Sequence, residues 1–281
     1  MSSTTVALQE RSRTSVYVHA FAGMLLRDAR VIVREIFPFL TRTIMNPFLF
    51  TFVFTYVFPK IGQGFNIPKP AAGPAISFAT ILVPGLVAVA MVFQGISAVA
   101  LPLVNEFGRT REIEDRVMAP VPVAFVGMEK IVFGAIQAVL AALIVFPFVI
   151  IIPSTPVSIH VSNWPLLVGM ILLASLVSGA LGLVIGTTFK PQQIPLIFSI
   201  IVIPTTFLGC VYYPWARLAP VKWLQVLVLV NPLVYMSEGL RMALTPELPH
   251  MSAWAFLLAL FGALALLSYF GLRSFVRRVV A

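Results

Sequence analysis

Long apolar runs alternate with short polar segments along the whole 281-residue chain. A helix needs about 20 apolar residues to cross the roughly 30 Å hydrocarbon core of a bilayer. Six runs meet that length, at residues 38–58, 78–104, 126–152, 166–189, 194–213 and 253–272. The pattern predicts an all-α integral membrane protein with six transmembrane helices.

A further apolar stretch, residues 221–230, is too short to form a seventh span. Asn231 and Pro232 interrupt it after about ten residues, half the length that a crossing needs. We therefore interpret residues 214–244 as a re-entrant helical hairpin that dips into the outer leaflet. Non-helical backbone at that depth has to be shielded by protein or to face water.

The segment before the first run has two faces when it is drawn as a helix. Three arginines, Arg27, Arg30 and Arg34, lie opposite an apolar face formed by Phe21, Leu25, Ala29, Ile32 and Ile36. This arrangement predicts an amphipathic interfacial helix on the cytoplasmic membrane surface, with its arginines near anionic lipid headgroups. A soluble helix that packs against a partner protein is the alternative.

Composition and charge place most of this chain in lipid. Hydrophobic residues make up 59% and charged residues 10%, whereas soluble domains have about 45–50% and 25%. The net charge of +9 does not indicate nucleic acid, because the basic residues are scattered between apolar runs. Fourteen of the 19 Lys and Arg residues lie on the side of both chain ends, which predicts cytoplasmic termini. We divide the chain into a cytoplasmic tail with the interfacial helix (1–37), a transmembrane domain (38–272) and a basic cytoplasmic tail (273–281).

The sequence shows no energy source of its own. None of the ten acidic residues lies at the centre of a predicted span, which argues against proton or sodium coupling. There is no phosphate-binding loop, metal-ligand motif or nucleophile elbow, so we expect no catalytic residue, metal or cofactor in this chain. The driving force is then expected from another subunit. The alternatives are an ion-coupled secondary carrier, an intramembrane lipid-modifying enzyme and a non-transporting anchor.

The loop between the second and third runs, residues 105–122, holds four of the ten acidic residues. Glu112 and Arg116 have the spacing and order that favour an ion pair on a helix. Ile113 and Val117 give that helix one apolar edge, and Pro120 ends it. A short helix of this kind suits docking into a groove on another protein. A solvated connector is the alternative.

This loop resembles the first intracellular loop of ABC-2 type transporter permeases. The family pattern is a glutamate, a glycine-containing turn, a charged helix and a proline before the third span. The residues here that the resemblance assigns to coupling are Glu106, Phe107, Gly108, Arg109, Glu112, Ile113, Arg116, Val117 and Pro120. The resemblance implies a coupling helix that inserts into an ATP-binding subunit, which itself holds ATP and Mg.

A second segment resembles the same family near the C-terminus. The family signature N-P-x-x-Y-x-x-E-x-x-R is matched by Asn231, Pro232, Tyr235, Glu238 and Arg241, and residues 207–214 resemble its F-L-S-G-x-F-F-P stretch. Glu238 and Arg241 are i,i+3 neighbours on a helix, so we expect them to pair. We expect this signature to hold the outer hairpin together rather than to touch cargo.

The resemblance covers nearly the whole chain and is nearest to antibiotic-resistance and nodulation-factor or polysaccharide export permeases. It implies a subunit of the bacterial inner membrane that works with an ABC ATP-binding subunit and with a second permease, either a copy or a paralogue. The implied cargo is an amphiphilic drug-like molecule, a lipid or a glycoconjugate.

Three features inside the predicted spans leave alternatives open. Gln94 and Gln137 either line a transport pathway or bond neighbouring helices. Small residues recur every four positions at Ala174, Ser178, Gly182 and Gly186, which allows close packing within the subunit or across a dimer. The first span has an aromatic residue at every second position from Phe48 to Phe58. Aromatic rings can stack on sugars, but residues at this spacing point around the helix, so we expect many of them to face lipid.

Overall fold

The computed structural model describes residues 13–34, 36–61, 77–107, 121–193, 196 and 198–280. These described residues are 84% helical and contain no strand, so the all-α prediction is confirmed. The α-helices are α1 (Arg13–Arg34), α2 (Ile36–Thr51), α3 (Phe58–Lys60), α4 (Phe78–Asn105), α6 (Val123–Ile151), α7 (Trp164–Thr188), α9 (Ile203–Phe207), α10 (Lys222–Leu227), α11 (Pro232–Leu244) and α12 (Ala253–Val280). Short 3₁₀ or π segments are η1 (Phe52–Val57), η3 (Pro191–Gln193), η4 (Phe198–Val202), η5 (Trp215–Leu218) and η6 (Val228–Val230).

Local side chains set where several helices begin. The Ser77 hydroxyl accepts a hydrogen bond from the Thr80 N–H at 3.3 Å at the start of α4, and Asn163 does the same for Leu166 at 3.0 Å at the start of α7. Asn231 accepts from the Leu233 N–H at 3.0 Å, directly before the proline that opens α11. Each side chain satisfies an amide that the first helical turn leaves without a partner.

Four helices, α4, α6, α7 and α12, are individually long and apolar enough to cross a membrane. The number rises to six if each of two bent helix pairs counts as one span. One pair runs from α1 into the α2–α3 segment with a bend of 85°. The other is Lys222–Val230 followed by Pro232–Leu244, bent by 98°. The chain is therefore a multi-pass membrane protein with four to six candidate spans.

The predicted fifth run, 194–213, is not one continuous helix in its described part. It contains the π-helical turn η4 and the short helix α9, which ends at Phe207. Residues after Phe207 turn, and Cys210 adopts a positive φ of 52°. The turn packs against α4 at Gly85, where an added Cβ would lie 2.4 Å from the Val211 carbonyl oxygen. Close backbone contact with α4 thus replaces the last helical turns that the apolar pattern predicted.

Helix α4 forms the centre of the bundle and α12 lies at its rim. Of the most apolar 18-residue window, 83% is buried in α4 but only 17% in α12. The small residues of α7 face α4: a Cβ added to Gly182 would lie 3.0 Å from the Gly95 carbonyl, and one on Gly186 would lie 3.0 Å from Ala100. The small-residue stripe is therefore used for packing within the subunit.

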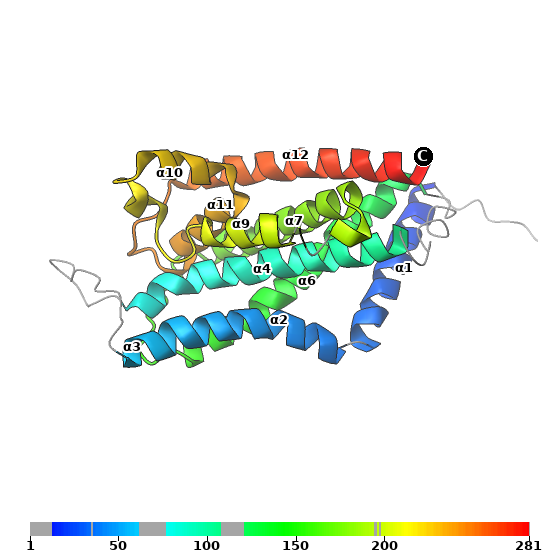
Figure 1. Cartoon of the computed structure of the whole chain (residues 1–281). Coiled ribbons are helices and arrows are strands. Elements are labelled where there is room, and N and C mark those ends of the chain that lie inside the picture. The colour runs from blue at the N-terminus through cyan, green and yellow to red at the C-terminus, as the bar shows by residue number, and fades with distance from the viewer. Residues whose placement is uncertain are drawn as a thin grey trace, which may run out of the picture.

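The bundle has two ends with different contents (Figure 1). At one, here called the basic end, α1 meets the last turns of α12. Both flanks of the 106–122 loop, which is the predicted 105–122 loop without the last residue of α4, lie there too. Tyr17, Phe107, Val121 and Phe275 belong to one apolar cluster there. At the other, here called the hairpin end, lie α3, the start of α4 and the turn carrying α10. Helix α12 continues to Val280, so most of the predicted basic tail is the last part of this helix.

Helix α1 only partly matches the predicted apolar face. Phe21, Leu25 and Ile32 are half-buried as expected, but Ala29 is exposed, and so is Ile36, which begins α2. The charged residue Asp28 is buried instead. The periodicity missed this arrangement because it treats every charge as solvent-facing, whereas Asp28 turns inward to an ion pair. A second apolar stripe on α1 is exposed and is formed by Val18, Leu26 and Val33.

Aromatic residues of the first span form two rows. Phe50 and Phe54 stack on each other and contact Tyr212, with ring centroids 6.4 and 5.3 Å from it. Phe48, Phe52 and Tyr56 form a separate stacked row and are 36–37% exposed. The first row packs under the turn that follows α9, and the second faces outward, as i+2 spacing requires.

Candidate functional site

A buried ion network lies at the basic end, where the 106–122 loop leaves the bundle. The Lys130 ammonium of α6 is 2.9 Å from carboxylate oxygens of both Asp28 in α1 and Glu106 after α4. The side chains are only 3–8% exposed. Buried charges persist only when they are paired and hydrogen-bonded. One lysine therefore ties together three segments that are far apart in the chain.

Phe107, the next residue of the loop, is held by α12. The Arg278 guanidinium lies over its ring at 4.5 Å, and the Phe275 ring centroid is 5.9 Å away. Arg278 also donates hydrogen bonds to the carbonyl oxygens of Gly186, Thr187 and Phe189, at 3.0–3.1 Å. A cation at the C-terminal end of α7 is favoured by the helix dipole. The start of the loop is thus connected to α7 and α12 as well.

The two flanks of the loop join one structural unit. Glu106 and Phe107 are connected to three helices, α1, α6 and α12, through Asp28, Lys130, Phe275 and Arg278. Val121 on the other flank lies in the same apolar cluster as Phe107 and Phe275. A displacement of the loop would therefore act on several helices together. The remaining coupling residues, Gly108, Arg109, Glu112, Ile113, Arg116, Val117 and Pro120, lie outside the described residues, and the coupling helix stays a prediction.

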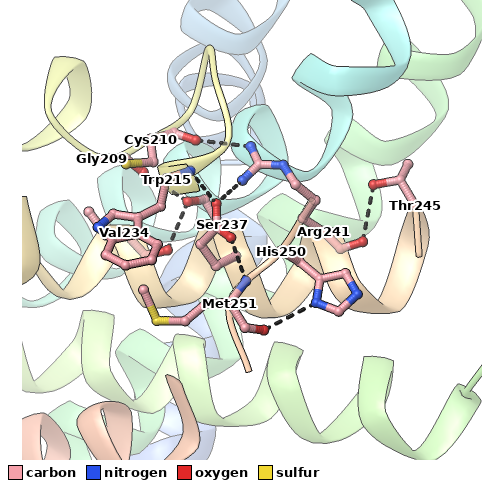
Figure 2. Close-up of polar contacts among 10 residues, drawn as sticks. Gly209, Cys210, Trp215, Val234, Ser237, Arg241, Thr245, His250 and Met251 are labelled. Atoms are coloured by element: carbon pink, nitrogen blue, oxygen red, sulfur yellow. Dashed lines mark hydrogen bonds and ion pairs between the residues drawn. The ribbon is translucent and has the colours of Figure 1, made fainter. Parts of the chain in front are cut away.

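The predicted Glu238–Arg241 pair is present in α11, and both side chains are fully buried. Figure 2 shows the Arg241 side chain directed toward the turn at Cys210. The Glu238 carboxylate also accepts hydrogen bonds from the backbone N–H groups of Trp215 and Met251, each at 2.9 Å. Arg241 donates to the Cys210 carbonyl at 2.9 Å. Cys210 has a positive φ, which is a strained conformation for a residue with a side chain. The carbonyl group of this same residue accepts the hydrogen bond from Arg241.

Other members of the same signature also bond to backbone. The Asn231 side-chain amide donates to the Thr205 carbonyl at 2.7 Å, and the Tyr235 hydroxyl donates to the Leu229 carbonyl at 2.8 Å. Ser237, within the signature, donates to the Gly209 carbonyl at 2.8 Å. These contacts fix the path of the chain from α9 through α11. They agree with a role in holding the hairpin.

The two glutamines inside the spans bond each other. The Gln94 amide of α4 donates to the Gln137 oxygen of α6 at 2.9 Å, and Thr43 of α2 donates to the Gln94 oxygen at 3.2 Å. Both glutamines are buried. The glutamines therefore bond neighbouring helices, which is one of the two interpretations of the sequence. The other, that they line a transport pathway, stays a prediction.

Sequence reasoning missed three residues of the basic end: Asp28, Lys130 and Arg278. Lys130 entered only the count of positive charges, although it stands beside Glu129 inside an apolar run. A charge inside an apolar run requires a buried partner, so the position of Lys130 in the sequence already indicated a buried ion pair. The partners themselves are 102 and 24 residues away, which no local pattern indicates. Among the described residues, no group of three His, Cys, Asp or Glu side chains could hold a metal ion.

Fold and site together define a helical multi-pass membrane protein whose polar connections concentrate at two ends. The family model of the ABC-2 type transporter matches residues 19–245, so the chain belongs to that family. The match includes both the 106–122 loop and the 214–244 segment predicted as a hairpin. No curated protein matches the chain. ABC-2 membrane proteins are the permease component of a transporter, and they usually work with an ATP-binding subunit.

Proposed function

We propose that this chain is the permease subunit of an ABC exporter in the bacterial inner membrane, with its basic end in the cytoplasm. A separate ATP-binding subunit, which binds ATP and Mg, docks on the 106–122 loop. A second permease, either a copy or a paralogue, completes the pathway. The cargo is an amphiphilic drug-like molecule, a lipid or a glycoconjugate. Membership of the ABC-2 family supports the transport role.

The observation that carries this proposal is the anchoring of the loop in the Lys130 network. Glu106 lies 2.9 Å from Lys130, which in turn binds Asp28 of α1. When the ATP-binding subunits close, the docked loop moves, and the rigid charge network passes that movement to α1 and α6. A loop that only connected two spans would need no such buried attachment.

The position of the loop also supports the proposed orientation. Its two flanks lie at the same end as α1 and the C-terminal turns of α12 (Figure 1). Fourteen of the 19 Lys and Arg residues belong to segments expected on that side, and such an excess favours the cytoplasm. An ATP-binding subunit can reach the loop only from there.

Exchanging the charges of the predicted docking helix tests the proposal. In Glu112→Arg with Arg116→Glu, opposite charges remain four residues apart, so a helix can still form, while the surface shown to a partner is reversed. We expect the purified complex to lose stimulation of ATP hydrolysis by cargo and to lose transport, while membrane insertion is unchanged.

The matched control is Lys222→Glu with Glu247→Arg, which exchanges two exposed charges at the hairpin end. It should leave coupling intact. Full ATPase stimulation and transport in the E112R/R116E complex would contradict the assigned role of the loop. Transport that collapses with an ionophore and persists without ATP would contradict the ABC exporter itself.

A further inference from the structure

A basic pocket lies between the end of α7 and the last turns of α12, beside the contacts of Phe107. Its volume is 620 Å³, and four cationic side chains line it: Lys190, Arg273, Arg277 and Arg278. As far as the chain is described, the lining includes no acidic residue. The pocket belongs to neither the ion network nor the outer hairpin.

The positive charge of the pocket is only partly offset by protein. Arg278 points to the carbonyl groups at the end of α7. Arg273 donates to the Tyr269 hydroxyl at 3.3 Å, which brings no negative charge. Within the described ranges, Lys190, Arg273 and Arg277 form no ion pair with a carboxylate. An anion in the pocket would be attracted by all of these cations and would also offset the repulsion between them.

The pocket lies where an apolar surface changes into a charged one. Arg273 and Arg277 are one helical turn apart and both are exposed. On the turns directly before them, Leu266, Tyr269 and Phe270 are 56–60% exposed. Phe270 also lines the pocket. A ligand that fits this surface has an anionic group for the arginines and an apolar part for the exposed face of α12.

We propose that this pocket binds the phosphate headgroup of an anionic phospholipid, whose acyl chains lie along α12. Arginine side chains can bind phosphate oxygens through two parallel N–H groups, and Ser274 in the lining offers a hydroxyl donor. Basic pockets between transmembrane helices suit such headgroups. The site depends only on the chain lying in a membrane, so it does not require the proposed coupling to an ATPase.

Lipid titration of the purified full-length chain in detergent tests the site. The readout is the midpoint of thermal unfolding as a function of added short-chain phosphatidylglycerol, which yields an apparent dissociation constant. For Arg273→Gln with Arg277→Gln we expect about thirtyfold weaker binding. The loss of one cation near an anionic headgroup weakens binding about fivefold, and this variant loses two. Both side chains are exposed, so the midpoint without lipid should equal that of the unaltered protein.

Two variants separate this site from a general effect of charge. Arg217→Gln with Lys222→Gln removes the same number of exposed cations from the hairpin end and should keep the response to phosphatidylglycerol. Arg273→Lys with Arg277→Lys keeps the charge and should bind more tightly than the glutamine variant. Equal loss in R217Q/K222Q and R273Q/R277Q, or no difference between the lysine and glutamine variants, would overturn the proposal.

Two further ligands distinguish the source of the anion. Phosphatidylcholine has the same acyl chains but no net charge, and it should shift the midpoint far less than phosphatidylglycerol. Inorganic phosphate has the charge but no acyl chains, and at equal concentration it should give no comparable shift. If phosphate alone reproduces the effect, the pocket is a site for a free anion and not for a lipid.

Discussion

Buried charges occur at both ends of this bundle, but they are connected differently. At the hairpin end, Glu238 and Arg241 are three residues apart in α11, and their other bonds go to the backbone of nearby loops. At the basic end, Lys130 joins side chains from two segments that are 102 and 24 residues away. The first cluster closes one hairpin, whereas the second links separate helices.

This difference suggests different uses. A local pair whose other partners are backbone groups holds one path of the chain from Cys210 to Met251. A network between α1, α6 and the end of α4 changes whenever one of these helices moves relative to the others. Stability should therefore depend more on the hairpin cluster, and coupling more on the basic end.

The largest expected effect is the loss of the hairpin cluster in Glu238→Gln. The substitution removes the negative charge and leaves Arg241 fully buried beside a neutral amide. Breaking a buried ion pair in this way costs about 3–5 kcal/mol in the free energy of unfolding. We expect a marked drop in the thermal unfolding midpoint of the detergent-purified protein and a lower yield of folded material.

The matched control is Glu247→Gln, because Glu247 is an exposed glutamate a few residues after α11. Its effect should stay within about 0.5 kcal/mol, as is usual for surface positions. Similar unfolding midpoints for E238Q and E247Q would show that the hairpin cluster contributes little to stability. The part of E238Q that does fold should transport cargo with a normal yield per ATP hydrolysed.

The hairpin cluster is also the part of the molecule that the sequence describes best. Its pair could be predicted because an i,i+3 spacing brings side chains together whatever the rest of the fold does. The Lys130 network could not, because its partners meet only through the packing of α1 against α6. Likewise, hydropathy located α4, α6, α7 and α12, but it could not show that residues after Phe207 turn against Gly85.

A smaller effect on stability, but a larger one on coupling, is expected for Lys130→Met. The variant keeps an unbranched side chain that is one atom shorter, and it removes the cation that Asp28 and Glu106 share. We expect a loss of about 3 kcal/mol, the lower end of the range for a broken buried ion pair, because these side chains are 3–8% exposed whereas those of the hairpin pair are fully buried. In the reconstituted complex, the amount of cargo moved per ATP should fall, because the loop is no longer attached to α1 and α6.

Two comparisons sharpen this prediction. Lys130→Arg preserves the charge and should retain most of the coupling, while Lys222→Met removes an exposed lysine at the hairpin end and should change neither quantity. If K130M transported normally per ATP while losing stability, the basic end would be a structural cluster of the same kind as the hairpin. The contrast between the two ends would then disappear.

The smallest effect on stability is expected for the neutral cluster between the two ends, in Gln94→Leu with Gln137→Leu. Both members of the 2.9 Å hydrogen bond are replaced by apolar side chains, so no buried amide is left alone. Thr43 still donates to the Phe39 carbonyl at 2.8 Å. Interhelical hydrogen bonds in membranes contribute on average only about 0.6 kcal/mol, and the unfolding midpoint should hardly change.

The same double variant decides between the two interpretations of these glutamines. If they only join α2, α4 and α6, transport by Q94L/Q137L should match its nearly unchanged stability. If they line the pathway, transport of a polar cargo should fall although the protein is as stable as before. The single variant Gln94→Leu is the control, because it leaves the Gln137 amide buried without this partner and should be less stable than the double variant. A loss of transport in Q94L/Q137L without a loss of stability would therefore place the cargo between α4 and α6.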